Sequence, residues 1–129
     1  MSTKDRILAS AQQLMSQKWF SIVSVADICR QADLSNGVFY RYFRNKEEVF
    51  RLLIERFLRI LEAELIALPG AADVPDQTER LQHFVDAMFS TFLSHRDLLS
   101  IFREGQYRYY EYEEELTDIY RRELERVLG

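Results

Sequence analysis

The sequence is poor in residues that cross-link a chain or interrupt its regular structure, since its 129 residues include one Cys, two Pro and four Gly. A single Cys excludes a disulfide framework and a metal site built from cysteines alone. No apolar run approaches the ~18 residues of a membrane span, and the first residues lack the apolar stretch of a signal peptide. No phosphate-binding glycine loop, nucleophile beside a base, or pair of catalytic carboxylates is present. We therefore expect a cytoplasmic globular protein without metal, cofactor, membrane contact or enzymatic activity.

Charge is distributed unevenly along the chain, whose formal net charge is −4. Residues 1–48 carry seven Lys or Arg against five acids, whereas residues 49–129 carry ten against sixteen. Four of the basic residues fall between Arg30 and Lys46, with Asp33 as the one acid among them. Because charges act over a Debye length of ~8–10 Å, a phosphate backbone responds to this local surplus and not to the total. We expect two domains, a mildly basic 1–48 and an acidic 49–129.

Apolar residues recur at three- and four-residue spacing in nearly every segment, which predicts helices. No alternating strand pair and no internal repeat is found, so we expect an all-α protein with an N-terminal three-helix bundle. Residues 69–76 hold both prolines and predict a linker. From the caps and breakers we expect helices over about 3–18, Ser24 to Ala32, Ser35 to Tyr42, Asn45 to Leu68, from Asp76, from Ser94 and from Gly105 to Leu128.

Residues 25–44 have the pattern of a helix-turn-helix. Such a unit needs a small residue facing its partner helix, a turn that tolerates an unusual dihedral, and an apolar side chain on the second helix. Cys29, Asp33 and Phe39 occupy these positions, and Asp can adopt the left-handed conformation at modest cost. In this motif the second helix of the pair lies in the DNA major groove.

The helix that starts at Ser35 is predicted to have a buried side with Phe39 and Phe43, which are four residues apart. Gly37 lowers helix propensity. It either permits close approach to DNA or relieves crowding within the protein. The exposed side carries Asn36, Val38, Tyr40 and Arg41. Tyr40, Tyr42 and Lys46 can donate hydrogen bonds to phosphate oxygens. Such contacts position a protein on DNA without specifying a sequence.

The N-terminal sequence resembles a known family. Ile7, Ala11, Leu14 and Met15 are followed by Ser24-Val25-Ala26-Asp27-Ile28-Cys29 and by the run Ala32 to Val49. This run contains Gly37-Val38-Phe39-Tyr40-Arg41-Tyr42-Phe43-Arg44-Asn45-Lys46-Glu47. In these residues the chain is similar to the TetR family of transcriptional regulators. The resemblance implies a repressor that binds a palindromic DNA operator as a homodimer, associates with the nucleoid when bound, and is released by a small molecule.

Operator contacts implied by the resemblance fall at the start of the second helix, along the third, and at the start of the fourth. Asn36 and Arg41 are our candidates for base recognition, because an amide pairs bidentately with adenine and a guanidinium with guanine. The implied DNA-binding residues are Ser24, Val25, Ala26, Ser35, Asn36, Gly37, Val38, Tyr40, Arg41, Tyr42 and Lys46.

Three residues depart from the family pattern. Trp19 stands where a glycine usually ends the first helix, and we expect it to deepen the core. Asp33 replaces a turn glycine and Cys29 replaces an alanine, which should cost some stability while the geometry stays possible.

For the aromatic residues of the C-terminal part, the resemblance implies a pocket between the fifth and seventh helices for an apolar or aromatic effector. Each of these residues also suits a core. Family members usually continue into two further helices that form the dimer interface. The chain is then either a fragment or dimerises through its last helices. Candidate effector residues are Phe84, Met88, Phe92, Phe102, Tyr107 and Tyr110.

Two other functions remain open on the sequence. A helical protein-interaction module, in which the helix-turn-helix is a packing unit, suits the weak net charge. An all-α enzyme acting on an aromatic or lipid substrate would need a catalytic pair that the sequence does not contain.

Overall fold

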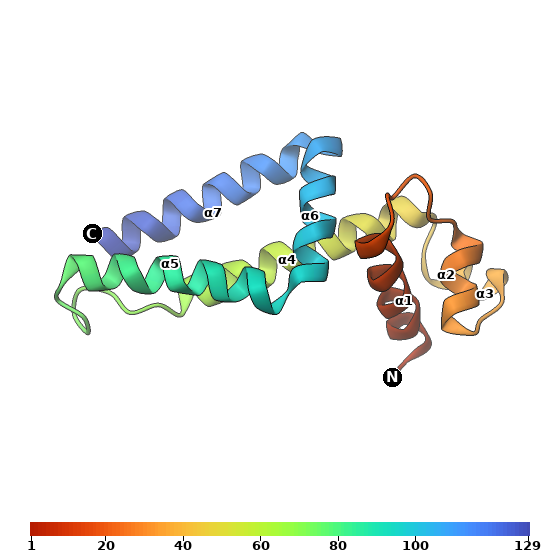
Figure 1. Cartoon of the computed structure of the whole chain (residues 1–129), viewed down its shortest axis with the longest axis horizontal. Coiled ribbons are helices and arrows are strands. Elements are labelled where there is room, and N and C mark those ends of the chain that lie inside the picture. The colour runs from red at the N-terminus through yellow and green to blue at the C-terminus, as the bar shows by residue number, and fades with distance from the viewer.

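One long helix, α4 (Lys46–Ile66), extends through most of the length of the protein in the computed structural model, which describes all residues 1–129 (Figure 1). It contacts α1, α5, α6 and α7. Its side chains at Leu53, Ile54 and Leu58 have no exposed surface. Because α4 has apolar residues on several sides, a single buried cluster joins the two ends of the molecule.

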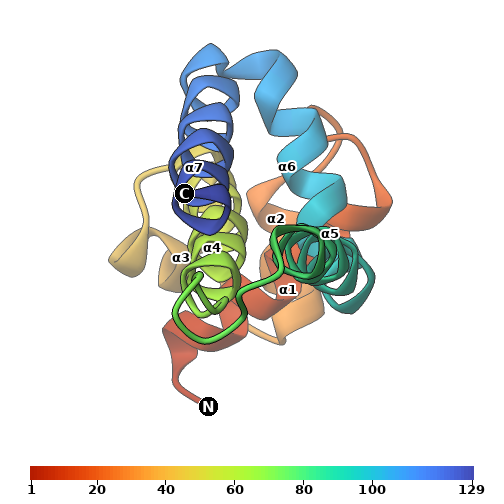
Figure 2. The same ribbon diagram turned by 90° about the vertical axis from the view of Figure 1, so that its left-hand side faces the viewer.

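Seven helices and no strand make up the fold, which confirms the all-α class. The helices α1–α3 lie at one end of α4, and α5–α7 surround the other, where α7 lies along α4 with α5 beside it (Figures 1 and 2). None of them is both long and apolar enough to cross a membrane. The bounds are α1 Thr3–Gln17, α2 Val25–Ala32, α3 Asn36–Tyr42, α4 Lys46–Ile66, α5 Gln77–Ser94, α6 Arg96–Arg108 and α7 Tyr110–Leu128.

The expected domain boundary at residue 48 falls inside the first turn of α4, which continues without interruption. The division into residues 1–48 and 49–129 therefore stays a prediction. The linker prediction matches the segment between α4 and α5, whose backbone is irregular from Ala67 to Asp76.

The predicted start of the last helix at Gly105 is wrong. Gly105 lies inside α6, which continues to Arg108, and the chain bends at Tyr109, where φ is −129° and ψ is 100°. A Cβ at Gly105 would stand 2.8 Å from Cγ1 of the buried Ile54. The glycine thus allows α6 to pack closely on α4 and does not mark a helix boundary.

Trp19 does not deepen the core, contrary to expectation. Its side chain is 68% exposed, whereas that of the next residue, Phe20, is 1% exposed and stacks on Phe50 with ring centroids 4.4 Å apart. Adjacent side chains in this irregular segment point in different directions, and Phe20 takes the inward position.

A buried arginine ties the linker to the end of α7. Arg80 is 5% exposed, and its guanidinium donates to the carbonyl oxygens of Val127 at 2.6 Å, Val74 at 2.7 Å and Pro75 at 2.8 Å. No carboxylate contacts it. Its charge is instead balanced by carbonyl dipoles, including those at the negative end of α7.

We expect Arg80→Met to lower the free energy of unfolding by ~2–4 kcal/mol, because one buried and two partly buried carbonyls lose a charged donor. Urea denaturation followed by circular dichroism measures this loss. The matched control is Arg121→Met on α7, whose ion pair with Asp118 is exposed and should contribute little to stability. Similar losses in both variants would contradict the role given to Arg80.

Candidate nucleic-acid interface

The start of α2 is held by a reciprocal capping box between Ser24 and Asp27. Asp27 N–H donates to Ser24 Oγ at 3.0 Å, and Ser24 N–H donates to Asp27 Oδ2 at 3.1 Å. These bonds to Ser24, and a further one from Arg30, hold the pKa of the Asp27 carboxyl below its usual range. The first turn of α2 therefore has a defined orientation at Ser24.

The turn between α2 and α3 has the predicted left-handed residue. Asp33 has φ 58° and ψ 50°, and the N–H of Leu34 donates to the carbonyl oxygen of Cys29 at 2.9 Å. Cys29 and Phe39 are fully buried, and this burial raises the pKa of the Cys29 thiol. These contacts confirm the helix-turn-helix, in which Asp33 performs the part of a turn glycine.

The first helix holds this unit in place through two side chains. Ser10 Oγ donates to the carbonyl oxygen of Ile28 at 2.7 Å inside the core. The Arg6 guanidinium donates to the carbonyl oxygen of Ala32 at 2.6 Å, at the C-terminal end of α2. The orientation of α2 and α3 is thereby fixed before any partner binds.

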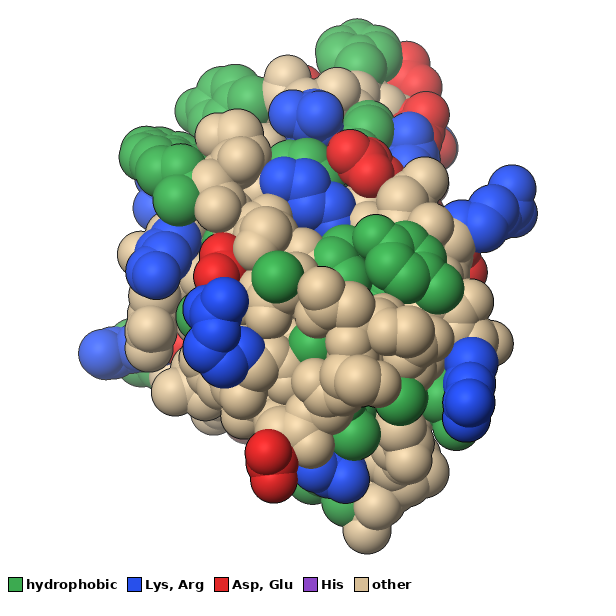
Figure 3. Space-filling model, turned by 90° about the vertical axis from the view of Figure 1, so that its right-hand side faces the viewer, with side chains coloured by type: hydrophobic (Ala, Val, Ile, Leu, Met, Phe, Trp, Pro, Cys, Tyr) green, Lys and Arg blue, Asp and Glu red, His purple; other side chains and the backbone are tan.

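One side of α3 presents polar groups that the protein itself does not use. Phe39 and Phe43 are buried as predicted, whereas Asn36, Tyr40 and Arg41 are exposed. Side chains in α3 and at its N-cap that make no hydrogen bond or ion pair within the chain are Ser35, Asn36, Tyr40, Arg41 and Tyr42. Figure 3 views the molecule from this end, where Lys and Arg side chains spread over and around the face and few Asp or Glu side chains appear.

Gly37 is open to solvent within α3. No atom of a neighbouring element lies within 4 Å of a Cβ placed there, and its backbone is helical. Crowding inside the protein therefore does not account for this glycine. Close approach of a partner to the start of α3 is the interpretation that the geometry leaves.

Two shallow hollows flank α3 and collect most of the predicted contact residues. The first, of about 400 Å³, is lined by Ser24, Val25, Tyr40 and Lys46, among others. The second, of about 490 Å³, includes Ala26, Ser35 and Asn36. Val38 is half-buried, and Arg41 and Tyr42 are exposed at the C-terminal end of α3. The predicted residues thus belong to one contiguous end of the molecule.

Lys46 makes contacts inside the protein that its position in the sequence does not predict. Its Nζ donates to the carbonyl oxygens of Phe20 at 2.8 Å and Val23 at 2.9 Å, and lies 4.3 Å from the centroid of the Phe20 ring. Most of its hydrogen-bonding capacity is spent inside the protein, where it holds the segment before α2.

Phe20 also contacts two side chains of α6, which the sequence pattern does not predict. The Phe20 N–H donates to Glu104 Oε2 at 2.9 Å, and the guanidinium carbon of Arg108 lies 4.7 Å from the centroid of its ring. Glu104 and Phe20 are 84 positions apart, so no local pattern could indicate this contact. Phe20 therefore links the helix-turn-helix end to both α4 and α6.

We expect Lys46→Met to lower the free energy of unfolding by ~1.5–3 kcal/mol, because the Phe20 and Val23 carbonyls lose a charged donor. Arg44→Met is the control, since the Arg44 side chain is exposed and should cost little. Thermal and urea denaturation of both variants measure the difference. Unchanged stability of the Lys46 variant would show that these bonds do not hold the segment.

The six candidate effector residues do not surround one space. Phe92 and Phe102 pack against Phe57, with ring centroids 6.1 Å and 5.2 Å away. Phe84 is buried near Tyr120 on α7, and Met88 is half-buried against the core. Tyr107 and Tyr110 lie on the surface, because α6 and α7 meet at Tyr109 and present both side chains outward.

Comparisons with known proteins agree with this geometry. Residues 7–53 match the bacterial regulatory proteins of the tetR family. The chain is 33% identical over 103 residues to the HTH-type transcriptional regulator EthR of Mycobacterium tuberculosis. The aligned region covers 78% of this chain and 45% of EthR. It is 25% identical over 93 residues to the HTH-type transcriptional repressor NemR of Escherichia coli, covering 72% of this chain and 46% of NemR.

Solved structures show a similar arrangement of helices. A TetR family protein from Vibrio parahaemolyticus has a TM-score of 0.65 and 23% identity, covering 95% of this chain and 65% of that one. The fatty acid degradation regulator FadR from Bacillus halodurans has a TM-score of 0.59 and 21% identity, covering 94% and 62%. These likenesses concern the fold alone.

The fold and the α2–α3 unit define an all-α protein of the helix-turn-helix class. In its N-terminal part, residues 7–53, which contains this unit, the chain is similar to the bacterial regulatory proteins of the tetR family. It spans about half the length of the curated relatives that it matches.

Proposed function

We propose that the protein is a transcription regulator that binds an operator through α3 and acts as a repressor rather than as an enzyme. The observation that carries this proposal is the set of unused, exposed polar side chains of α3, beside an open glycine and among basic side chains. The family match and the naming of its relative NemR as a repressor support it.

In this proposal the phosphate backbone is held by Tyr40, Tyr42 and the charge of Lys46, and bases are recognised by Asn36 and Arg41. Ser24 and Ser35 lie at the starts of α2 and α3, where a hydroxyl and a positive helix end suit phosphate. Two copies would place their α3 helices in successive major grooves, ~34–36 Å apart on a palindromic operator.

The proposed effector is a small apolar or aromatic molecule bound among the helices around Phe92 and Phe102. Its binding would change the angle between the α1–α3 bundle and the core. Such coupling requires the effector to bind one arrangement of the helices more tightly than the other.

The proposal is tested by fluorescence anisotropy with a mixed-sequence duplex and with a duplex selected from a random pool. We expect micromolar binding to the mixed duplex, with a logarithmic salt slope of ~0.9 per phosphate neutralised, and tighter binding to the selected one. Absence of salt-dependent binding would favour the protein-interaction module instead.

Asn36→Ala and Tyr42→Phe should separate recognition of bases from contact with the backbone. We expect Asn36→Ala to change the sequence selected and to cost ~1–3 kcal/mol on the original duplex only. Tyr42→Phe should weaken binding to selected and mixed duplexes equally. Equal losses on both duplexes for Asn36→Ala would remove its role in base recognition.

Gly37→Ala should raise stability and lower DNA affinity together. The added methyl group meets no neighbouring element, and alanine favours a helix over glycine by up to ~1 kcal/mol. The same methyl group would stand between α3 and the groove. Urea denaturation and duplex anisotropy on one preparation measure both effects. Undiminished DNA affinity would show that close approach at Gly37 is not needed.

A further inference from the structure

An open groove of about 1110 Å³ lies where the helix-turn-helix end meets the core. One wall is the C-terminal end of α1 and the segment after it, and the other wall is α6, which lies beside that end of α1 (Figure 1). We call it the junction groove. Its volume is slightly above the ~300–1,000 Å³ of typical sites for small organic ligands, so such a ligand fits without filling it.

Large apolar side chains surround the junction groove and remain in contact with solvent. Trp19 and Ile22 from the first wall are largely exposed, and Tyr107 from α6 is 87% exposed. Met15 and Leu99 complete the apolar lining. Trp19 cannot turn inward, because Phe20 beside it is held through its N–H, its carbonyl oxygen and its ring. The fold thus presents an aromatic surface at this place.

The same groove carries three positive side chains against one carboxylate. Lys18, Arg96 and Arg103 line it and make no ion pair or side-chain hydrogen bond within the chain. Its one acid, Glu104, already accepts the N–H of Phe20. Between α4 and α7, by contrast, Arg51, Arg59, Arg122 and Arg126 each contact a carboxylate.

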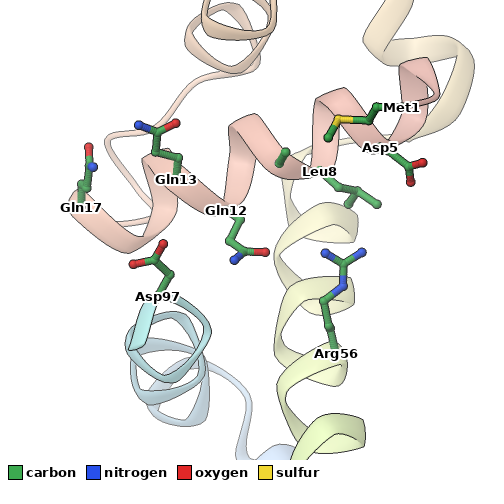
Figure 4. Close-up of a pocket in the computed structure, with 9 residues that line it drawn as sticks. Met1, Asp5, Leu8, Gln12, Gln13, Gln17, Arg56 and Asp97 are labelled. Carbon is green, nitrogen blue, oxygen red and sulfur yellow. The ribbon is translucent and has the colours of Figure 1, made fainter. Parts of the chain in front are cut away.

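A second pocket, beside α1, differs from the junction groove in both its charge and its lining. It measures about 730 Å³ and is lined by glutamines, by Asp5 and Asp97, and by Arg56 from α4 (Figure 4). Its two carboxylates outnumber its one cation, and no aromatic residue lines it. It offers neither the charge nor the flat surface of the junction groove, so it serves as an internal control.

We infer that the junction groove binds a small amphipathic anion, with a flat apolar body beside Trp19 and a carboxylate, sulfonate or phosphate group at the cations. Stacking on an indole favours an aromatic body, and a guanidinium pairs with such anionic groups in a bidentate way. The surplus of positive charge excludes a cationic ligand, and the apolar lining disfavours a simple inorganic ion.

Binding at this place would bridge α1 and α6, since each supplies one wall and the Phe20 to Glu104 bond joins them. An effect of the anion on DNA affinity rests on the proposed function, whereas the binding itself does not.

The test uses two probes that differ in one group, 8-anilinonaphthalene-1-sulfonate and its uncharged counterpart N-phenyl-1-naphthylamine. Trp19 is the only tryptophan, so quenching of its emission through energy transfer reports binding. We expect saturable binding of the sulfonate about tenfold tighter than that of the neutral probe, as three partly exposed cations would produce. Equal affinities of the two probes would overturn the assignment of an anion site.

Arg103→Gln should weaken the sulfonate about three- to fivefold and leave the neutral probe unchanged, because one exposed charge is removed. Arg56→Gln, in the second pocket, is the matched control and should change neither affinity. A sulfonate affinity that is unaffected by Arg103→Gln, or equally affected by Arg56→Gln, would place the probe elsewhere and overturn the inference.

A separate measurement examines the link to DNA. We expect saturating sulfonate to change the affinity for a duplex by about fivefold or more, within the usual range of coupling between sites. An unchanged duplex affinity with the groove occupied would contradict the coupling. Failure to bind any duplex would contradict the proposed function and leave the fluorescence result on the groove intact.

Discussion

Phe20 makes the densest set of polar and aromatic contacts between the helix-turn-helix end and the rest of the protein. Its N–H is bound by Glu104 of α6, its carbonyl oxygen by Lys46 of α4, and its ring stacks on Phe50. Cations from both helices lie over the same ring. One buried residue thus connects the segment that leads into α2 with both α4 and α6.

This constraint gives the two ends of the molecule different roles. At the outer end, the capping box, the left-handed Asp33 and the bonds from α1 give α2 and α3 a fixed relative orientation. At the inner end, α5–α7 are joined through carbonyl contacts such as those of Arg80 and through ion pairs between α4 and α7. Phe20 therefore lies where the outer end packs against α4 and α6.

Local patterns in the sequence are sufficient to predict the helix-turn-helix of α2 and α3. Ser24 with Asp27, and Phe39 with Phe43, are three or four positions apart, so helical geometry alone places each pair together. The turn at Asp33 follows equally from the tolerance of that residue for positive φ. Residue spacing does not predict hydrogen bonds between residues far apart in the sequence, such as those from Lys46 to Phe20 and from Arg80 to Val127. These bonds depend on how whole helices pack. The sequence pattern predicts a buried Trp19 and a helix start at Gly105, and both predictions are wrong for the same reason. Packing on α4 buries Phe20 in place of Trp19 and puts Gly105 inside α6.

The central claim, that the exposed side of α3 and the start of α2 meet DNA while the core does not, is tested most directly by NMR. Amide chemical shifts of the labelled protein would be followed during titration with a selected duplex. The account predicts that the largest changes fall on residues 24–26 and 35–46, with smaller changes transmitted along α4 and α6. Changes concentrated on α5 and α7, with α3 unaffected, would contradict it.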